Sequence, residues 1–427
     1  SRAYIGERVT ESLGLLYAMH WPYRQPQTAR GVRRSPFHDR LAAQGACFGE
    51  TAGWERPHWF GAAGSKPLED HSWFGDASKP MVASEHAAVR SGVAAFDISS
   101  YGKFMVSGAA AESALNAICA NTMSIAVGAI VYTQCLNIRG GIEADVTITR
   151  LSNDQFLILT AAGTTRRDFG FFRAAIAAVD ATVAVSDVTS GWAGLAIMGP
   201  RSRELLTRLT AADLSTAAFP FATAQELEVG AAPVQALRVT YVGSLGWELW
   251  FPTEFAAYVF DRVMEVAGEF GLKFAGMHAM DSCRLEKAYP LWGKDLGDET
   301  TPLEAGLGFA VTLDSGRQFT GREALLKQRE SGIKSRLTQF GLKDKNRLLY
   351  KDEPIWLGDR IVGRLSSGSY GHHLGHAVGL GFVTLGQGLT ETNIPEQKYQ
   401  IEIAGERFDA TAHLQAIHDP TSREILS

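Results

Sequence analysis

The stretch NIRGGIEAD, residues 137–145, decides the fold more than any other part of the sequence. Its paired glycines accept a positive φ without steric cost, so they mark a tight turn between two strands. Asp145 opens the run DVTIT, in which polar and apolar residues alternate as in a half-buried strand. Asp145 therefore lies at the base of a hairpin and shares a face of its strand with Thr147. On this local pattern alone, a solvated turn carboxylate is favoured over a functional one.

Outward from this hairpin, apolar periodicity predicts a mixture of strands and helices. Strands are expected at 103–106, 155–160, 194–198, 235–242 and 247–251, and helices at 84–90, 110–120, 165–179, 201–209, 255–266 and 277–287. These elements do not alternate as regular βαβ units, so the pattern indicates an α+β fold of mixed sheets and helices.

The two ends of the chain differ from this central part. Residues 1–75 are rich in Trp, Pro, Arg and His and have few periodic stretches, so we expect an irregular segment that packs on a larger body. After about Ser331, short apolar strands recur between turn residues, which predicts a small all-β barrel or sandwich. We therefore divide the chain into residues 1–75, a linker-like segment, residues 76–330, the mixed body, and residues 331–427, a C-terminal β-barrel domain.

Composition excludes several classes of protein. The chain has 427 residues, of which 45% are hydrophobic and 20% charged, as in an ordinary globular protein. A net charge of −5 without a run of Lys or Arg argues against nucleic acid as a partner. The apolar runs stay well below the roughly 18–20 residues that a membrane helix needs, so no membrane association is expected.

The cysteines indicate a reducing compartment. Four are present, far apart and without a CxxC pair: Cys47, Cys119, Cys135 and Cys283. We expect reduced, buried thiols and a cytoplasmic protein, or a mitochondrial matrix protein if the source is eukaryotic.

A second informative stretch is YVGSLGWEL, residues 241–249. Glu248 lies within an apolar strand beside Trp247, where a carboxylate must be paired, exposed or used to hold a ligand. The edge of an aminopyrimidine is a suitable partner, because it offers two parallel N–H donors to one carboxylate. An exposed strand position explains the residue equally well.

A third stretch, MDSCRLEK at residues 280–287, alternates charges around Arg284. A solvated helix with internal ion pairs is the favoured interpretation. His372 and His376 are four residues apart, but glycines beside them indicate a turn and no third ligand follows, so no metal site is expected. No Gly-x-Gly-x-x-Gly motif follows a strand near the N-terminus, which argues against flavin or nicotinamide binding by this chain.

Together these motifs resemble the folate-binding C-terminal half of the dimethylglycine dehydrogenase and sarcosine dehydrogenase family, which is similar to the glycine-cleavage aminomethyltransferase, or T-protein. The resemblance covers nearly the whole chain, and residues 35–57 are similar to the segment that joins the flavin half to the folate half. Besides the stretches quoted above, it rests on SPFHDR at 35–40, GWERP at 53–57, TPLEAGL at 301–307, FTGRE at 319–323 and SGSYG at 367–371. The sequence departs from T-protein at Ser244, where Glu is usual, and at His278 and Met280, which flank positions that are often basic. These changes affect the expected substrate geometry more than folate binding.

The resemblance implies a folate-binding aminomethyltransferase-like fold and a role for each motif. Asp145 would be catalytic, Tyr241 and Glu248 would orient the pterin of tetrahydrofolate, and Arg284 would form an ion pair that is structural or lies beside the folate. The implied reaction takes the one-carbon unit of an oxidised N-methyl amine, such as dimethylglycine or sarcosine, and gives 5,10-methylenetetrahydrofolate.

The resemblance also implies a flavin partner. FAD would be held by another half of a longer polypeptide or by a separate subunit, and that half would select the methyl donor. Two alternatives stay open: a stand-alone tetrahydrofolate-dependent demethylase or methyltransferase, and a folate-binding module without catalysis.

Overall fold

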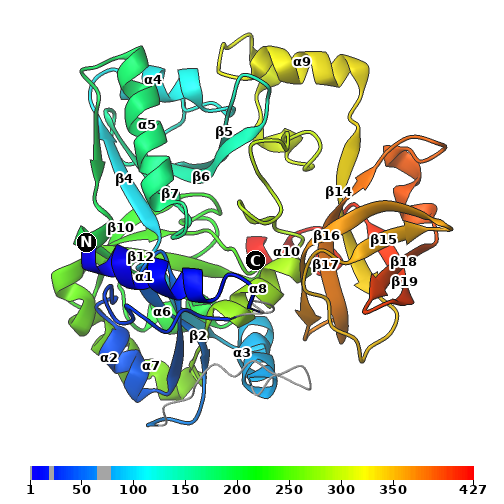
Figure 1. The fold of residues 1–427 in the computed structure, drawn as a ribbon. Helices are drawn as coiled ribbons and strands as arrows, with labels where there is room; N and C mark the ends of the chain where they lie inside the picture. Colours follow the sequence, from blue (N-terminus) through cyan, green and yellow to red (C-terminus); the bar gives the residue numbers. More distant parts are fainter. Residues whose placement is uncertain (1, 19–23, 65–77) are drawn as a thin grey trace. The chain divides into compact units, whose positions relative to one another are not determined.

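A computed structural model describes residues 2–18, 24–64 and 78–427 (Figure 1). The chain forms two compact units, each made of several segments. The first comprises Ser1–Ser100, Ser190–Ala218 and Glu226–Asp281; the second comprises Tyr101–Thr189, Phe219–Gln225 and Ser282–Ser427. Within the described residues, every helix is too short or too polar to cross a lipid bilayer.

The first unit is built on a six-stranded sheet of order β10-β11-β12-β9-β3-β13. Its strands are β10 (Ala224–Val229), β11 (Ala232–Leu237), β12 (Gly246–Pro252), β9 (Trp192–Met198), β3 (Ala94–Asp97) and β13 (Lys273–Phe274). Strand β12 is buried almost throughout because its sequence, GWELWFP, is largely aromatic and aliphatic. Helices α3 (Lys79–Ser91), α6 (Ser202–Thr207) and α7 (Ala256–Phe270) belong to this unit.

The strand expected at 235–242 ends earlier than its apolar sequence predicts. The ladder between β11 and β12 ends at the pair Leu237 and Glu248. The backbone N–H of Val239 then donates to the carbonyl of Leu237 at 3.1 Å, which turns the chain out of the sheet. Residues 238–245 therefore form a loop that contains Tyr241.

The N-terminal segment is regular, so the expectation of irregular structure is wrong for its described residues. It contains α1 (Arg2–Gly14), α2 (His38–Ala43) and a hairpin of β1 (Ala46–Thr51) and β2 (Trp54–Phe60). The hairpin turn consists of Ala52 and Gly53, both with positive φ (51° and 84°), as two-residue hairpin turns prefer. Because alanine rarely adopts this conformation, the turn could not be predicted from the sequence.

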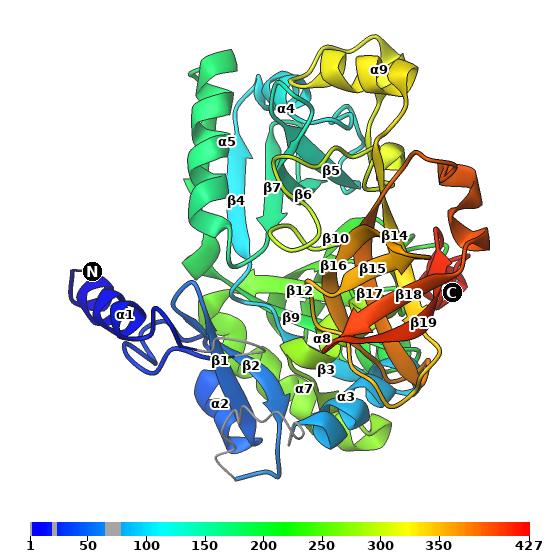
Figure 2. The same cartoon turned by 45° about the vertical axis from the view of Figure 1, so that its right-hand side comes forward.

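The second unit contains an antiparallel sheet of order β5-β6-β7-β4-β8. Its strands are β5 (Ile130–Leu136), β6 (Ile142–Arg150), β7 (Gln155–Thr160), β4 (Gly102–Ser107) and β8 (Ala184–Asp187). Alternate residues such as Val146 and Ile148 form one core with α4 (Ala111–Ile118) and α5 (Thr165–Val179), which cover one face of the sheet (Figure 2). Asp145 and Thr147 project from the opposite face, as the period of two requires.

The C-terminal part of the second unit is a closed six-stranded barrel, which confirms the expected β-barrel domain over a sandwich. Its ring order is β14-β17-β16-β15-β18-β19, and each strand is antiparallel to both neighbours. The strands are β14 (Ser335–Leu342), β15 (Pro354–Leu357), β16 (Arg360–Gly371), β17 (His376–Thr384), β18 (Tyr399–Ile403) and β19 (Glu406–His413). Phe340, Ile355, Leu365 and Tyr399 are among the residues that fill its interior.

Short helices connect these parts. The remaining α-helices are α8 (Met277–Glu286), α9 (Arg322–Ser331) and α10 (Arg423–Leu426), and the 3-10 helices are η1 (Thr189–Gly191), η2 (Thr253–Phe255), η3 (Gly308–Ala310), η4 (Leu313–Ser315) and η5 (Glu391–Glu396). The α+β class predicted from the sequence is thereby confirmed, with the mixed sheets preceding the barrel along the chain.

Candidate functional site

Asp145 lies on β6, directly opposite Gln134 of β5 in the antiparallel ladder. The Gln134 side chain is fully buried and donates from Nε2 to Oδ1 of Asp145 at 2.9 Å. Tyr132, two residues along the same face of β5, also donates a side-chain hydrogen bond to this carboxylate. Asp145 itself is half-buried. It is therefore a positioned carboxylate and not a solvated turn residue.

The environment of Asp145 makes its charged form costly. Burial raises the pKa of Asp145 to about 6, which outweighs the lowering effect of the hydrogen bonds from Gln134 and Tyr132. The negative charge of Asp168 raises the pKa further. A carboxyl group whose pKa lies near neutrality is suited to exchange protons with a substrate amine.

The turn before Asp145 is built by Asn137 and the glycine pair. Oδ1 of Asn137 accepts hydrogen bonds from the backbone N–H of Arg139 at 2.9 Å and of Gly141 at 3.1 Å. Gly140 has a φ of 86°, and a Cβ added at Gly141 would lie 1.8 Å from the carbonyl oxygen of Asp298. Asn137, Gly140 and Gly141 are therefore each required by the backbone conformation of the turn. The turn in turn fixes where β6, and with it Asp145, begins.

Arg167 of α5 ties the hairpin to its surroundings. Its guanidinium makes a short ion pair with Glu143, lies 3.2 Å from Oδ1 of Asp168, and sits 4.3 Å from the centre of the Trp292 ring. The Trp292 indole N–H donates to the carbonyl of Ile142 at 2.9 Å. These contacts hold the start of β6, just before Asp145.

Glu248 lies in the middle of β12 in the first unit, and its side chain is 8% exposed. The indole N–H of Trp250 donates to its Oε2 at 3.2 Å and is its sole hydrogen-bond donor within the described part of the chain. Burial raises the pKa of Glu248 to about 7. A buried carboxylate with a single donor has acceptor capacity left for a ligand that offers N–H groups.

Tyr241 is half-buried in the loop that precedes β12. Arg90 of α3 holds this loop by donating from Nη1 to the carbonyl of Val242 at 2.6 Å and to Oγ of Ser244 at 2.9 Å. Ser244, the position at which the sequence departs from the T-protein pattern, therefore has a partner within its own unit.

Arg284 of α8 is completely buried in the second unit. Its guanidinium donates to Oδ2 of Asp295 at 2.7 Å, to Oγ of Ser367 at 2.9 Å and to the carbonyl of Tyr289 at 3.1 Å. This network joins α8 to a following loop and to β16, which supports a structural ion pair for Arg284. The prediction of a solvated helix with internal ion pairs is wrong, because the whole segment from Ser282 to Lys287 is buried.

The four predicted site residues fall in two groups. Asp145 and Arg284 belong to the second unit, where they make no hydrogen bond or ion pair with each other, and Tyr241 and Glu248 belong to the first. Gln134 and Tyr132 were not predicted as site residues, because their closeness to Asp145 depends on the strand register.

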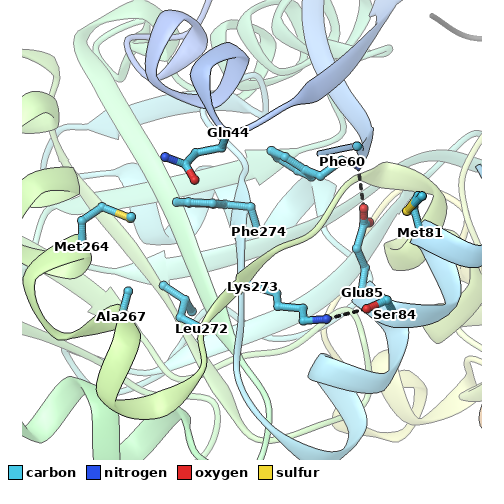
Figure 3. A pocket seen from close by; sticks show the side chains of 11 residues that line it. Gln44, Phe60, Met81, Ser84, Glu85, Met264, Ala267, Leu272, Lys273 and Phe274 are labelled. Atoms are coloured by element: carbon cyan, nitrogen blue, oxygen red, sulfur yellow. Dashed lines mark hydrogen bonds between the residues drawn. The ribbon is translucent and has the colours of Figure 1, made fainter. Parts of the chain in front are cut away.

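The first unit also contains a cavity of about 330 Å³ that includes none of these four residues (Figure 3). Phe60, Phe274 and Met81 form part of its wall, and Glu85 lies at one side with its carboxylate pointing toward Phe60. Glu85 accepts the backbone N–H of Phe60 at 2.7 Å and that of Gly276 at 2.9 Å, and burial raises its pKa to about 7. These bonds connect β2 and α3 to the start of α8.

The cysteine side chains form no disulfide among the described residues. All four cysteines are free and buried, and Sγ of Cys119 lies 3.8 Å from Sγ of Cys135 in the core of the second unit. Residues 2–18, 24–64 and 78–427 contain no group of three or more His, Cys, Asp or Glu side chains arranged to hold a metal ion.

A mixed α+β body followed by a closed six-stranded barrel, with an acidic residue on a Gly-Gly hairpin, defines an aminomethyltransferase-like class of protein. Residues 37–315 match the GCVT N-terminal domain, and residues 336–419 match the glycine cleavage T-protein C-terminal barrel domain. The chain belongs to the glycine cleavage T-protein family, and the resemblance found in its motifs is confirmed. Residues 1–35 match a different family, the FAD dependent oxidoreductase central domain.

Curated relatives extend over the full chain. 4-Methylaminobutanoate oxidase (formaldehyde-forming) of Paenarthrobacter nicotinovorans is 37% identical over 100% of this chain and 51% of its own length. The mitochondrial sarcosine dehydrogenase of Homo sapiens is 31% identical over 99% of the chain and 50% of its length, and the mitochondrial pyruvate dehydrogenase phosphatase regulatory subunit of Mus musculus is 33% identical over 98% and 49%. The chain thus spans about half the length of these relatives.

A solved structure has the same fold. Glycine cleavage system aminomethyltransferase T from Bartonella henselae aligns with a TM-score of 0.77 over 91% of this chain and 99% of that one. At 22% identity, this match confirms the aminomethyltransferase-like fold and its barrel.

Proposed function

We propose that this chain binds tetrahydrofolate and loads onto it the one-carbon unit released by oxidative N-demethylation, which gives 5,10-methylenetetrahydrofolate. The observation that carries the proposal is Asp145, a half-buried carboxylate with a pKa of about 6 that Gln134 and Tyr132 hold in one orientation. A carboxyl group with these properties, at the base of the Gly-Gly hairpin, is the acid that proton transfer to and from an amine requires.

The residues proposed for folate fit its chemistry. The pterin ring presents an aminopyrimidine edge with two N–H donors, and Glu248 is a buried carboxylate to which Trp250 donates one bond. Tyr241, seven residues before Glu248 in the same unit, would contact the ring by stacking or by its hydroxyl. Arg284 is proposed chiefly as a structural residue, because Asp295 and Ser367 occupy its guanidinium.

Proton transfer is the proposed work of Asp145. When bound, tetrahydrofolate supplies two amines, N5 and N10, which take up the carbon of formaldehyde or of an iminium and release water or the parent amine. The ionised Asp145 would accept a proton from an amine as its bond to carbon forms, and the protonated acid would return that proton to the departing group. Its negative charge also stabilises a cationic, iminium-like state nearby. Such a group contributes typically ~10²–10⁴-fold to a rate.

The donor and the flavin partner are part of the proposal. The relative from Paenarthrobacter nicotinovorans is a formaldehyde-forming oxidase of a methylamino acid, and the human relative is a sarcosine dehydrogenase, by their names. We therefore propose an N-methyl amine as the source of the carbon and an FAD-containing domain or subunit as its oxidant. The match of residues 1–35 to an FAD dependent oxidoreductase domain supports this partner. The division at residues 75 and 330 is also proposed, and limited proteolysis would test it.

The first experiment measures formation of 5,10-methylenetetrahydrofolate from tetrahydrofolate and formaldehyde, with and without the chain, beside Asp145→Ala. We expect an acceleration over the uncatalysed background that the variant loses. Equal acceleration by both proteins would refute the role of Asp145. Absence of tetrahydrofolate binding would refute the proposed function as a whole.

A regulatory role is the second candidate, because one relative of similar identity is named as a regulatory subunit. In that case the chain would bind folate without accelerating the reaction, and Asp145→Ala would behave like the parent. The stand-alone demethylase is distinguished in the same assay, since it would form methylated or methylene folate directly from a methylated donor without a flavin.

A further inference from the structure

The carboxylate of Glu248 is held by a neighbour on its own strand. Glu248 and Trp250 are two residues apart on β12, so their side chains leave the same face of the sheet. The indole N–H of Trp250 donates to Oε2 of Glu248 at 3.2 Å, and both side chains are buried, that of Trp250 completely. Because an indole N–H can only donate, this bond requires Oε2 to be an acceptor and leaves Oε1 for another partner.

Gly194 of β9 provides the space that this indole occupies. It lies directly opposite Trp250 in the antiparallel ladder of β9 and β12. A Cβ added at Gly194 would lie 2.2 Å from Cζ3 and 2.6 Å from Cε3 of the indole, on the edge of the ring away from its N–H. Gly194 has no positive φ, so glycine is needed here for space and not for backbone conformation. The Trp250 ring therefore packs against the backbone of β9.

The backbone of Gly194 is itself anchored. Its N–H donates to Oγ of Ser99 at 3.1 Å, and its carbonyl accepts the Ser99 hydroxyl at 3.3 Å and the backbone N–H of Ile98 at 3.1 Å. The backbone N–H of Ser99 donates in turn to Oδ1 of the buried Asp97 at 3.0 Å. This backbone cannot give way without breaking several hydrogen bonds, so the position of Trp250 is fixed.

We infer that Trp250 and Gly194 are positioning residues for Glu248: the glycine seats the indole, and the indole N–H orients the carboxylate toward a ligand edge with two adjacent N–H donors. For the identity of that ligand, tetrahydrofolate, the inference rests on the proposed function. The aminopyrimidine edge of the pterin ring offers such a pair of donors. Trp250 acts through Glu248 and needs no contact with the ligand itself.

A double-mutant cycle tests whether Trp250 acts through Glu248. Trp250→Phe keeps an aromatic ring and removes the N–H donor. We expect the affinity of the full chain for tetrahydrofolate, measured by calorimetry at pH 8, to fall about tenfold. When Glu248→Gln is already present, Trp250→Phe should cause no further loss. Gly194→Ala should weaken binding in the same way, because the added methyl group displaces the indole.

Two matched controls make the result specific. In the barrel, the indole N–H of Trp356 donates to Oε2 of Glu402 at 2.8 Å. Trp356→Phe removes the same kind of bond and should leave the affinity for tetrahydrofolate unchanged. Gly268→Ala is the control for a glycine replacement, because a Cβ there meets open space on α7. Urea denaturation of each variant verifies that it folds.

The pH dependence of stability gives a readout that needs no ligand. Two effects set the pKa of Glu248: burial, which raises it to about 7, and the bond from Trp250, which lowers it. Loss of that bond should raise the pKa further. The fall in the free energy of unfolding with rising pH should therefore continue to a higher pH in Trp250→Phe than in the parent. In the presence of Glu248→Gln, Trp250→Phe should leave this pH profile unchanged.

Several outcomes would overturn the inference. They are parental affinity for tetrahydrofolate in Trp250→Phe, an equal loss of affinity with and without Glu248→Gln, and a stability profile that Trp250→Phe does not move. An equal loss in Trp356→Phe would mean that the effect is a general one of removing an indole. If the parent binds no tetrahydrofolate but the stability profile moves as expected, the proposed function fails while the positioning of Glu248 stands.

Discussion

Gln134 and Asp145 face each other across the β5–β6 ladder, and the amide Nε2 of the first donates to Oδ1 of the second at 2.9 Å. The bond selects one orientation of the carboxylate and stabilises its ionised form, while burial opposes ionisation. A general base needs both effects, because a freely rotating or permanently charged group would transfer a proton less efficiently.

Replacement of the acid should separate binding from transfer. Asp145→Asn keeps the shape and the contact with Gln134 but cannot accept the proton, so we expect tetrahydrofolate affinity within about twofold of the parent and a rate lower by ~10²–10⁴-fold. Asp154→Asn, on the exposed turn after β6, is the matched control and should leave both unchanged. Calorimetry measures the affinity and the methylene-folate assay measures the rate; a parental rate in Asp145→Asn would contradict the assignment.

The rate should depend on pH through Asp145. If the ionised carboxylate accepts the proton, transfer increases as pH rises through about 6 and then levels off. Gln134→Met removes a hydrogen bond that lowers the pKa of Asp145 without changing the size of the side chain greatly, so the midpoint should move to higher pH. A pH–rate profile of the two proteins measures the shift. If the midpoint of the pH–rate profile moves to lower pH or stays in place, the titration that controls the rate is not that of Asp145.

The buried carboxylate of Glu248 should lower the stability of the folded protein at neutral pH while it contributes to tetrahydrofolate binding. Burial raises its pKa from 4.5 to about 7, so the folded state holds more protons than the unfolded state between these values. The free energy of unfolding therefore falls as pH rises through this window, and the loss is complete above pH 7. Glu248→Gln removes the charge, and we expect roughly 1–3 kcal/mol more stability at pH 8, with no gain at pH 4.

The same variant should bind tetrahydrofolate at least tenfold more weakly, because a neutral amide cannot pair with two N–H donors. Urea denaturation at both pH values and calorimetry provide the two measurements. Glu254→Gln, on an exposed residue after β12, is the control for a change of charge alone. Unchanged folate affinity in Glu248→Gln would rule out a direct contact with the pterin.

Arg284 and Asp295 should behave as a structural pair. Both side chains are completely buried, so Asp295→Asn leaves a buried guanidinium without its counter-charge, which costs about 3–5 kcal/mol. Asp314→Asn breaks the exposed pair with Arg329 and should cost less than about 1 kcal/mol. Thermal melts compare the two. If Asp295→Asn instead kept its stability and lost folate affinity, Arg284 would be assigned to the ligand.

Much of the fold is predictable because burial on one face leaves a period in the sequence. The predicted strand 155–160 and helix 165–179 coincide with β7 and α5. Strand Asp145 to Thr149 falls within β6. In these elements the apolar positions follow a single local rule, so no knowledge of the partner element is needed.

The parts that were missed depend on contacts between distant residues. Gln134 meets Asp145 only because a register shift between Cys135 and Leu136 sets the pairing of β5 with β6, and a one-residue slip would place another side chain there. The apolar residues of α1 are also periodic, but they are few and lie in a Trp- and Pro-rich segment, so the helix was not predicted. Asp145 and Glu248 were recognised by pattern, whereas their raised pKa values follow from burial that the pattern does not report.

The closed barrel has a practical consequence for handling the protein. Each of its six strands is paired on both sides, so the barrel presents no open backbone edge on which a strand from another molecule could add. Cross-β assembly is therefore not expected to start there. In concentrated samples, we instead expect association to begin at the exposed apolar residues of α1, Ile5, Val9 and Leu13. A mild detergent, or an aspartate introduced on that helix, should then keep the solution clear.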